Sequence, residues 1–343
     1  MNYVQHFPSG ELTLDKSFSS HSEEKVLFVS LDTEYTRLDK NNNLCLSWQL
    51  AVYSAHTGLY ATQIVYMDYE TKERLNSNEV LSIAFELAGL SATDALGYEI
   101  VIICHSCGAE LSMLSNRKNI SQHLEFVYKS VVTYTPRPFP FLMDDGLIVK
   151  LKLRVCDTLL LLPVSHQSLD KATSLLADKY HKKSLSSAEK DDMLTLLLTD
   201  PKRFEEYAIH DAVITLMLFI KLQYLLNHIN NSEDAHFTTI GGATVKIFKK
   251  YITQHFPEGT FSSQFNQKNS IYQKGLSLAQ RAYLGGLNNS YVVGEVTGEL
   301  ILDIDFSSAY PTVMGLLPLA EFGTAPAPIR KSKKKFTLGR DHD

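Results

Sequence analysis

The chain has 343 residues, 44% of them hydrophobic, and a formal net charge of −5 at pH 7. This length has room for two domains and a sizeable core. The charge excludes a uniformly basic surface of the kind that coats nucleic acid, although a local groove needs only a few Lys and Arg facing one way.

The first residues, 1–25, are polar and aperiodic, and this predicts a flexible N-terminal arm. Strand-like apolar runs follow at 25–35, 47–55 and 60–69, and short connections favour three adjacent strands in meander order. The further elements expected in chain order are a helix over 76–90, a strand over 99–105, a helix from about Ala109, a strand pair across 147–162, a helix over 168–180 and a long helix from about Phe204 to Leu226.

Strands in meander order that then alternate with helices predict an α/β fold, in which helices flank a mixed sheet. The pattern breaks after Asn227, so we expect one domain over 26–228 and a second region over 229–325. The Pro-, Ala- and Lys-rich residues 326–343 predict a basic, disordered tail. The longest apolar run, near "VITLMLFI", is too short to span a bilayer, and no transmembrane segment is expected.

Two acidic residues, Asp32 and Glu34, stand two apart at the end of the first buried strand. Their side chains therefore project from the same face of the sheet and repel each other. A divalent cation would neutralise them, and oxygen ligands favour Mg²⁺ or Mn²⁺. A solvated pair of loop carboxylates is the alternative.

Further candidates lie in "HSCGAELS" and "YAIHDAVI". Glu110 falls in the first turn of a helix that follows a buried strand, where the helix dipole alone would favour a carboxylate. Tyr207 and Asp211 are four residues apart, so they share one helix face and can reach one site together. A half-buried Tyr beside a surface Asp is the plain structural alternative.

These motifs, in this order, resemble those of the DEDD superfamily of 3′→5′ exonucleases, in the tyrosine-bearing branch found in family B DNA polymerases. The resemblance spans about residues 26–226 and implies a ribonuclease H-like domain. It implies that Asp32, Glu34, Glu110 and Asp211 bind two Mg²⁺ or Mn²⁺ ions and that Tyr207 orients the attacking water. The products would be nucleoside 5′-monophosphates released from single-stranded 3′ ends.

The second motif departs from the pattern of that family. Ser106 stands where the family usually has Asn, and Glu110 where it has Asp. Glu keeps the charge and reaches one methylene further, whereas Ser lacks the amide that would contact the DNA strand. A weakened exonuclease, or a non-catalytic module that binds DNA and docks a polymerase, are both compatible with this change.

A second resemblance lies in "DFSSAYPT", residues 305–312, which matches the first palm motif of family B DNA polymerases. It implies that Asp305 binds metal, that the backbone at Ser307 and Ser308 holds a deoxynucleoside triphosphate, and that Tyr310 lies beneath its sugar.

Upstream, Tyr283, Gly285 and Gly286 resemble the linker motif with which protein-primed members of that family touch the template. Paired glycines let a backbone approach phosphates closely.

The second palm carboxylate strand and the cationic fingers have no counterpart in the sequence. We therefore expect the N-terminal part, or one subunit, of a family B polymerase that cannot polymerise alone. The resemblance implies primer-template DNA and a second polymerase subunit as partners. The four cysteines lie on strand-like apolar runs, which favours a reduced, intracellular protein, so we expect it in the cytoplasm or where a virus, plasmid or other mobile element replicates.

Three other hypotheses have less support. Cys104 and Cys107 have the spacing of zinc ligands, but Cys45 and Cys156 occur singly on other strands. His210 with Asp211 forms an HD pair without the further His and Asp residues that HD phosphohydrolases require. A stand-alone RNase D-like nuclease would leave residues 283–312 without a role.

Overall fold

The computed structural model describes residues 4–6, 25–38, 43–68, 70–127, 130–177, 180–232, 236–255, 312–313 and 316. The chain divides into two units, Met1–Tyr251 and Ile252–Asp343, and the account below concerns the first. This unit continues beyond residue 228, the end of the first domain predicted from sequence, and includes most of helix α9.

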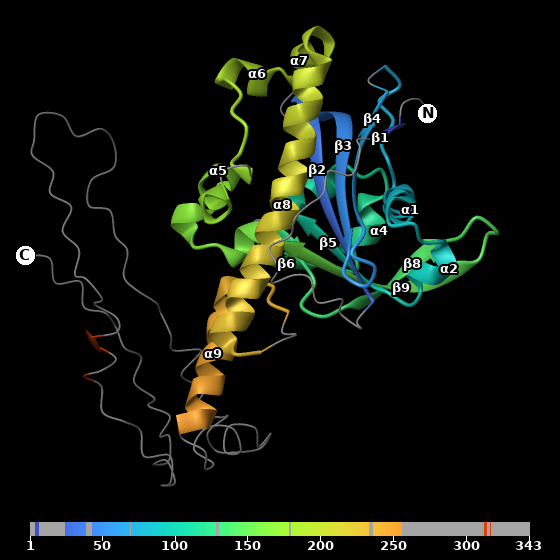
Figure 1. Cartoon of the computed structure of the whole chain (residues 1–343). Coiled ribbons are helices and arrows are strands. Elements are labelled where there is room, and N and C mark those ends of the chain that lie inside the picture. Colours follow the sequence, from blue (N-terminus) through green and yellow to red (C-terminus); the bar gives the residue numbers. More distant parts are fainter. Residues whose placement is uncertain are drawn as a thin grey trace, which may run out of the picture. The chain divides into compact units, whose positions relative to one another are not determined.

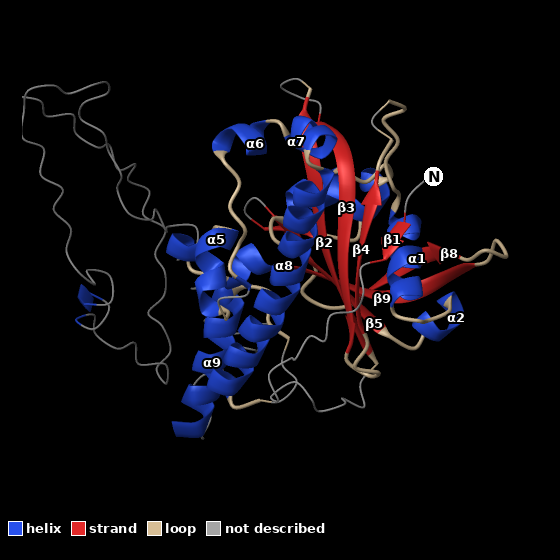
Figure 2. Cartoon of the chain, turned by 45° about the horizontal axis from the view of Figure 1, so that its top comes forward, coloured by secondary structure: helices blue, strands red, loops and turns tan. Residues whose placement is uncertain are grey.

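The first unit is an α/β structure built on a mixed sheet (Figures 1 and 2). Its strand order is β1-β4-β3-β2-β5-β9-β8. Strands β2, β3 and β4 are antiparallel neighbours, as the predicted meander requires, whereas β5 is parallel to β2 and β9 is parallel to β5. The strands of this sheet are β1 (Val4–His6), β2 (Val26–Arg37), β3 (Asn43–Ser54), β4 (Tyr60–Tyr66), β5 (Glu99–Cys104), β8 (Arg137–Leu142) and β9 (Ile148–Asp157).

Helices cover both faces of the main sheet (Figure 2), and a small hairpin forms a second, two-stranded sheet that contacts β9. The helices are α1 (Ser77–Leu87), α2 (Ala92–Ala95), α3 (Cys107–Ser112), α4 (Arg117–Ser121), α5 (Leu169–Ala172), α6 (Ser187–Asp191), α7 (Met193–Thr199), α8 (Pro201–Asn230) and α9 (Ile240–His255). The hairpin consists of β6 (Glu125–Val127) and β7 (Ser130–Val132).

Strand β2 is central, and its alternating side chains separate two cores. Leu27, Val29 and Leu31 face one core together with α1. Val26 and Phe28 face the other, beneath α8. Because the alternation continues along the strand, Asp32 and Glu34 fall on the α8 face.

Helix α8 crosses β2 and β3 and positions its middle residues over this face. It begins at Pro201, where a missing N–H costs nothing, and the Asp200 side chain accepts a hydrogen bond from the Arg203 N–H. Helix α8 is long and apolar enough to cross a membrane. However, 61% of its most apolar 18-residue stretch is buried inside the protein, as in the core helix of a soluble protein, so its length and apolarity are weak evidence for a membrane span.

Some local predictions were wrong. The strand pair across 147–162 is a single strand, β9, which pairs with β8, and a 3₁₀ helix over Thr158–Leu161 follows it. The strand ends there because the Asp157 side chain accepts a hydrogen bond from the Leu159 N–H and caps the turn. The helix expected over 168–180 is the short α5 followed by a 3₁₀ turn. The predicted N-terminal arm stays a prediction; of its residues the structure describes Lys25 and Val4–His6, the latter forming β1, which pairs with β4.

The edge strand β8 is protected against pairing with a further strand. Pro138 and Pro140 alternate with the buried Phe139 and Phe141. Because proline has no N–H, these two positions cannot donate to β9 or to a strand added outside. Prolines at an edge are one of the devices that oppose edge-to-edge aggregation.

Candidate metal centre

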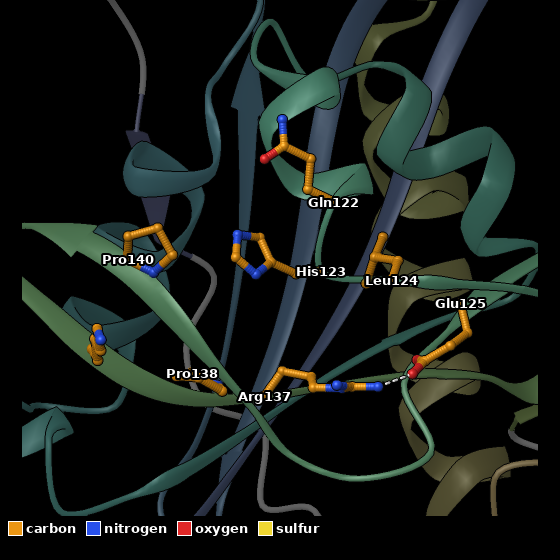
Figure 3. A pocket seen from close by; sticks show the side chains of 8 residues that line it. Gln122, His123, Leu124, Glu125, Arg137, Pro138 and Pro140 are labelled. Atoms are coloured by element: carbon orange, nitrogen blue, oxygen red, sulfur yellow. Dashed lines mark hydrogen bonds and ion pairs between the residues drawn. The ribbon is translucent and has the colours of Figure 1, made fainter.

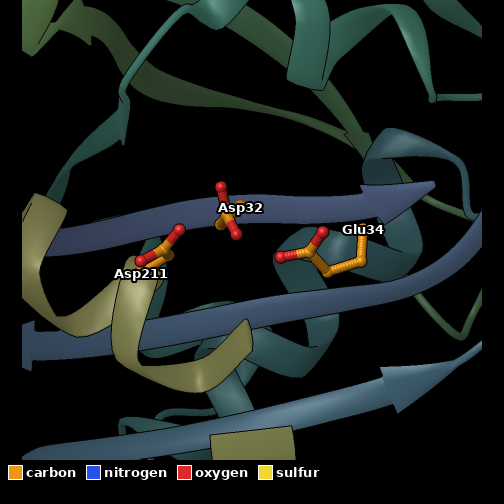
Figure 4. Close-up of side chains that lie close together, drawn as sticks. All are labelled: Asp32, Glu34 and Asp211. Atoms are coloured by element: carbon orange, nitrogen blue, oxygen red, sulfur yellow. The ribbon is translucent and has the colours of Figure 1, made fainter. Parts of the chain in front are cut away.

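Three of the predicted carboxylates converge in the space between β2 and α8 (Figure 4). Asp32 and Glu34 approach it from the strand, and Asp211 from the helix. One carboxylate oxygen from each lies within 4.8 Å of the other two. Residues separated by nearly 180 positions along the chain therefore form one acidic cluster.

The three carboxyl groups of this cluster ionise less readily than exposed ones. Desolvation raises the pKa of Asp32 well above its usual range, and the charges of Glu110, Glu34 and Asp211 raise it further. Desolvation likewise raises the pKa of Glu34 and the pKa of Asp211. The charge of Asp211 raises the pKa of Glu34 further. The carboxylates thus oppose one another's ionisation in the absence of a cation.

The two carboxylate oxygens of Asp211 differ in their contacts. Its Oδ2 forms an ion pair with the Lys182 ammonium. Its Oδ1 is buried and has no hydrogen-bond partner among the described residues. A buried oxygen without a donor is costly, and a bound cation is one of the explanations for it.

Glu110 is near this cluster but outside the set of three. It lies in the first turn of α3, as predicted, and is buried. Its Oε2 accepts a hydrogen bond from the Thr33 hydroxyl, and Thr33 lies on the opposite face of β2 from Asp32 and Glu34. Its role as a metal ligand stays a prediction.

Burial governs the protonation of Glu110. Desolvation raises its pKa to about 8, and the charges of Asp157 and Asp211 act in the same direction. Two hydrogen bonds from Thr33 act in the opposite direction. A carboxyl with this pKa holds its proton through much of the neutral range.

Tyr207 lies beside Asp211, as their spacing on one helix face predicted. The ring of Tyr207 is buried and packs under the Lys182 ammonium, which lies 5.2 Å from the ring centroid. Desolvation and the charge of Asp211 raise the pKa of the phenol, so the hydroxyl keeps its proton.

Lys182 was missed by the sequence interpretation. Burial alone would lower the pKa of its ammonium, but Asp211 and Tyr207 outweigh that effect and raise it. It belongs to the segment between α5 and α6, where neither periodicity nor a motif marks a single lysine among its polar neighbours. Only the packing of that segment against α8 reveals its position.

Strand β3 adds polar side chains to the same face of the sheet. Gln49 pairs with Asp32, and Ser47 with Glu34, in the register of β2 and β3. Both are fully buried. The Gln49 amide donates to the Ser47 hydroxyl at 2.6 Å, and the Gln49 Oε1 has no partner among the residues described. The sequence shows them only as polar residues inside an apolar strand.

A separate hollow of about 440 Å³ lies at the β8 edge of the sheet (Figure 3). It contains none of the predicted carboxylates. Its rim carries the ion pair of Arg137 with Glu125. The residues that line it are Gln122, His123, Leu124, Glu125, Arg137, Pro138, Pro140 and Lys150.

Comparison with known proteins adds no assignment. Neither a protein-family model nor a curated protein sequence matches this chain. Any function therefore has to be argued from the site itself.

The predicted polymerase residues lie outside the described part of the chain. These are Tyr283, Gly285, Gly286, Asp305, Ser307, Ser308 and Tyr310. Their roles stay predictions. The four cysteines are free and buried, Cys45 and Cys156 among them, and no zinc-type cluster occurs among the described residues.

Proposed function

We propose that this protein is a metal-dependent 3′→5′ exonuclease acting on single-stranded DNA ends. The observation that carries the proposal is the convergence of Asp32, Glu34 and Asp211, with ligand oxygens within 4.8 Å of one another. Carboxylates gathered this closely raise one another's pKa, and a divalent cation would neutralise their charge. Kinship with family B DNA polymerases stays part of this proposal.

The donor set fits Mg²⁺ or Mn²⁺. All three ligands are carboxylates, which these hard cations prefer, and the buried Oδ1 of Asp211 lacks a donor among the described residues. Asp32, Glu34 and Asp211 would hold the ions, and Glu110 stays a predicted further ligand. Bound ions would supply activation of a water and stabilisation of the departing 3′-oxygen.

The fold supports the finer, ribonuclease H-like assignment. The site lies on the central strand of a mixed sheet, in which the meander β2-β3-β4 is extended on the other side by the parallel strands β5 and β9. Helix α8 crosses this strand and carries Asp211, the third carboxylate of the cluster. This arrangement agrees with the domain that the motif order implies.

The chain itself supplies two further groups for the reaction. Tyr207 keeps its proton next to Asp211, so its hydroxyl can donate a hydrogen bond to a water or a phosphate oxygen. Lys182 keeps its positive charge beside both residues and can stabilise negative charge on a phosphodiester.

A second candidate, a DNA-binding module without nuclease activity, is favoured by two contacts. Lys182 already neutralises one oxygen of Asp211, and Thr33 engages Glu110. If these contacts persist, the domain would bind DNA phosphates through its cationic side chains and would not cleave the strand.

The test compares four proteins on a 5′-labelled single strand of DNA with Mn²⁺. Asp32→Ala and Asp211→Ala should slow release of nucleoside monophosphates by about 10²–10³-fold. Asp191→Ala, the same change at an exposed acid on α6, should keep the wild-type rate. Equal rates in all four proteins would refute the proposal, and DNA binding without cleavage in all four would establish the binding module.

A further inference from the structure

Asp157, at the end of β9, is a fully buried carboxylate that the proposed reaction does not use. It accepts four hydrogen bonds. Two come from the backbone N–H groups of Ser106 and Cys107, each at 2.9 Å, and one from that of Leu159 at 3.0 Å. The fourth comes from the Ser130 hydroxyl. Hydrogen bonds to an ionised acceptor are stronger than those between neutral groups.

These hydrogen bonds stabilise a turn whose backbone conformation is unfavourable. Ser106 connects β5 to α3 with a φ of +88°, in the left-handed region that residues with a Cβ seldom adopt. Its own side chain makes no capping bond to the helix. The Asp157 carboxylate therefore supplies the contacts that hold Ser106 and Cys107 in this conformation.

The turn determines where α3 begins, and α3 carries Glu110 in its first turn. Glu110 in turn contacts Thr33, the residue between Asp32 and Glu34 on β2. A continuous series of hydrogen bonds and backbone thus connects Asp157 to the strand that bears two candidate metal ligands.

We propose that Asp157 is a positioning residue for the metal centre: it clamps the left-handed turn at Ser106 and so places Glu110 against β2. This inference rests on the proposed function, because it assumes that Asp32, Glu34 and Asp211 bind metal. Partners outside the first coordination sphere commonly affect metal affinity ten- to a hundredfold.

Asp157→Asn tests the clamp with almost no change in shape. An amide has one oxygen and one NH₂ group, so it cannot accept from both Ser106 N–H and Cys107 N–H through separate oxygens. Mn²⁺ affinity, measured by calorimetry without DNA, should fall about ten- to a hundredfold. Hydrogen exchange of the Ser106 and Cys107 amides should accelerate.

Rescue distinguishes the clamp from a general structural role. Ser106→Gly in the Asp157→Asn background should restore most of the Mn²⁺ affinity, because glycine adopts positive φ without strain. Ser106→Ala, which keeps the Cβ, should not. Thr133→Val is the matched control, since it removes another buried hydrogen bond to β9, from the Val155 N–H, and should leave Mn²⁺ affinity unchanged.

Wild-type Mn²⁺ affinity in Asp157→Asn, or equal effects of glycine and alanine at 106, would overturn the inference. If Asp157→Asn does not fold, Ser130→Ala removes one donor to the same carboxylate, and it should lower Mn²⁺ affinity more than Thr133→Val does. A wild-type protein that binds Mn²⁺ but cleaves no DNA would refute the proposed function alone, because the clamp is measured by binding and exchange.

Discussion

Replacing Glu110 by Gln should flatten the dependence of folding stability on pH in the metal-free protein. The side chain is 6% exposed and has a pKa of about 8, against an ordinary value of 4.5. Between these two pH values the folded protein holds a proton that the unfolded chain has released. The stability that this proton contributes is complete below pH 4.5, decreases as pH rises, and is lost above about pH 8.

The effect is a large fraction of the total stability of a domain. At about 1.4 kcal/mol for each pH unit between 4.5 and 8, the wild type loses roughly 5 kcal/mol through this group as pH rises. Gln cannot release a proton, so Glu110→Gln should gain that amount relative to the wild type across the same window. Domains are commonly stable by only about 5–15 kcal/mol.

Urea denaturation with EDTA at pH 5, 6.5, 8 and 9 measures this difference. The exposed Glu86 on α1 provides the control, and Glu86→Gln should keep the wild-type slope. Parallel stability profiles for Glu110→Gln and the wild type would show that Glu110 is ionised in the folded protein at neutral pH. That result would refute the reasoning from burial.

Three further predictions concern the same domain. Lys182→Met should destabilise the metal-free protein by about 3 kcal/mol at pH 8 in urea titrations, because it leaves Asp211 buried without its ion pair; an unchanged midpoint would contradict this. Ser106→Asn with Glu110→Asp should accelerate DNA cleavage if the second motif is merely weakened, and a rate that does not rise would favour the binding module. Pro140→Thr should restore an N–H at the edge of β8 and promote self-association in sedimentation experiments, whereas a wild-type sedimentation coefficient would argue against edge protection by proline.

Periodicity was sufficient to predict the α/β class, the meander and the long helix. Apolar alternation in β2 and the helical spacing in α8 are local properties, and the buried faces that they indicate are the ones observed. Local patterns failed where a side chain from the same segment ends an element, as Asp157 does at the end of β9. The apolar residues 158–161 continue the pattern of a strand, so nothing in their composition predicts the 3₁₀ helix.

For the site, the sequence by itself determined that Asp32 and Glu34 share one face of a strand and that Tyr207 and Asp211 share one face of a helix. Two-residue and four-residue spacings are sufficient for this, because strand and helix geometry are local. Only the tertiary structure decided that α8 lies over the face bearing Asp32, that Lys182 pairs with Asp211, and that Glu110 reaches Thr33. Those contacts depend on which faces of distant segments become buried together, and a spacing along the chain carries no information about that packing.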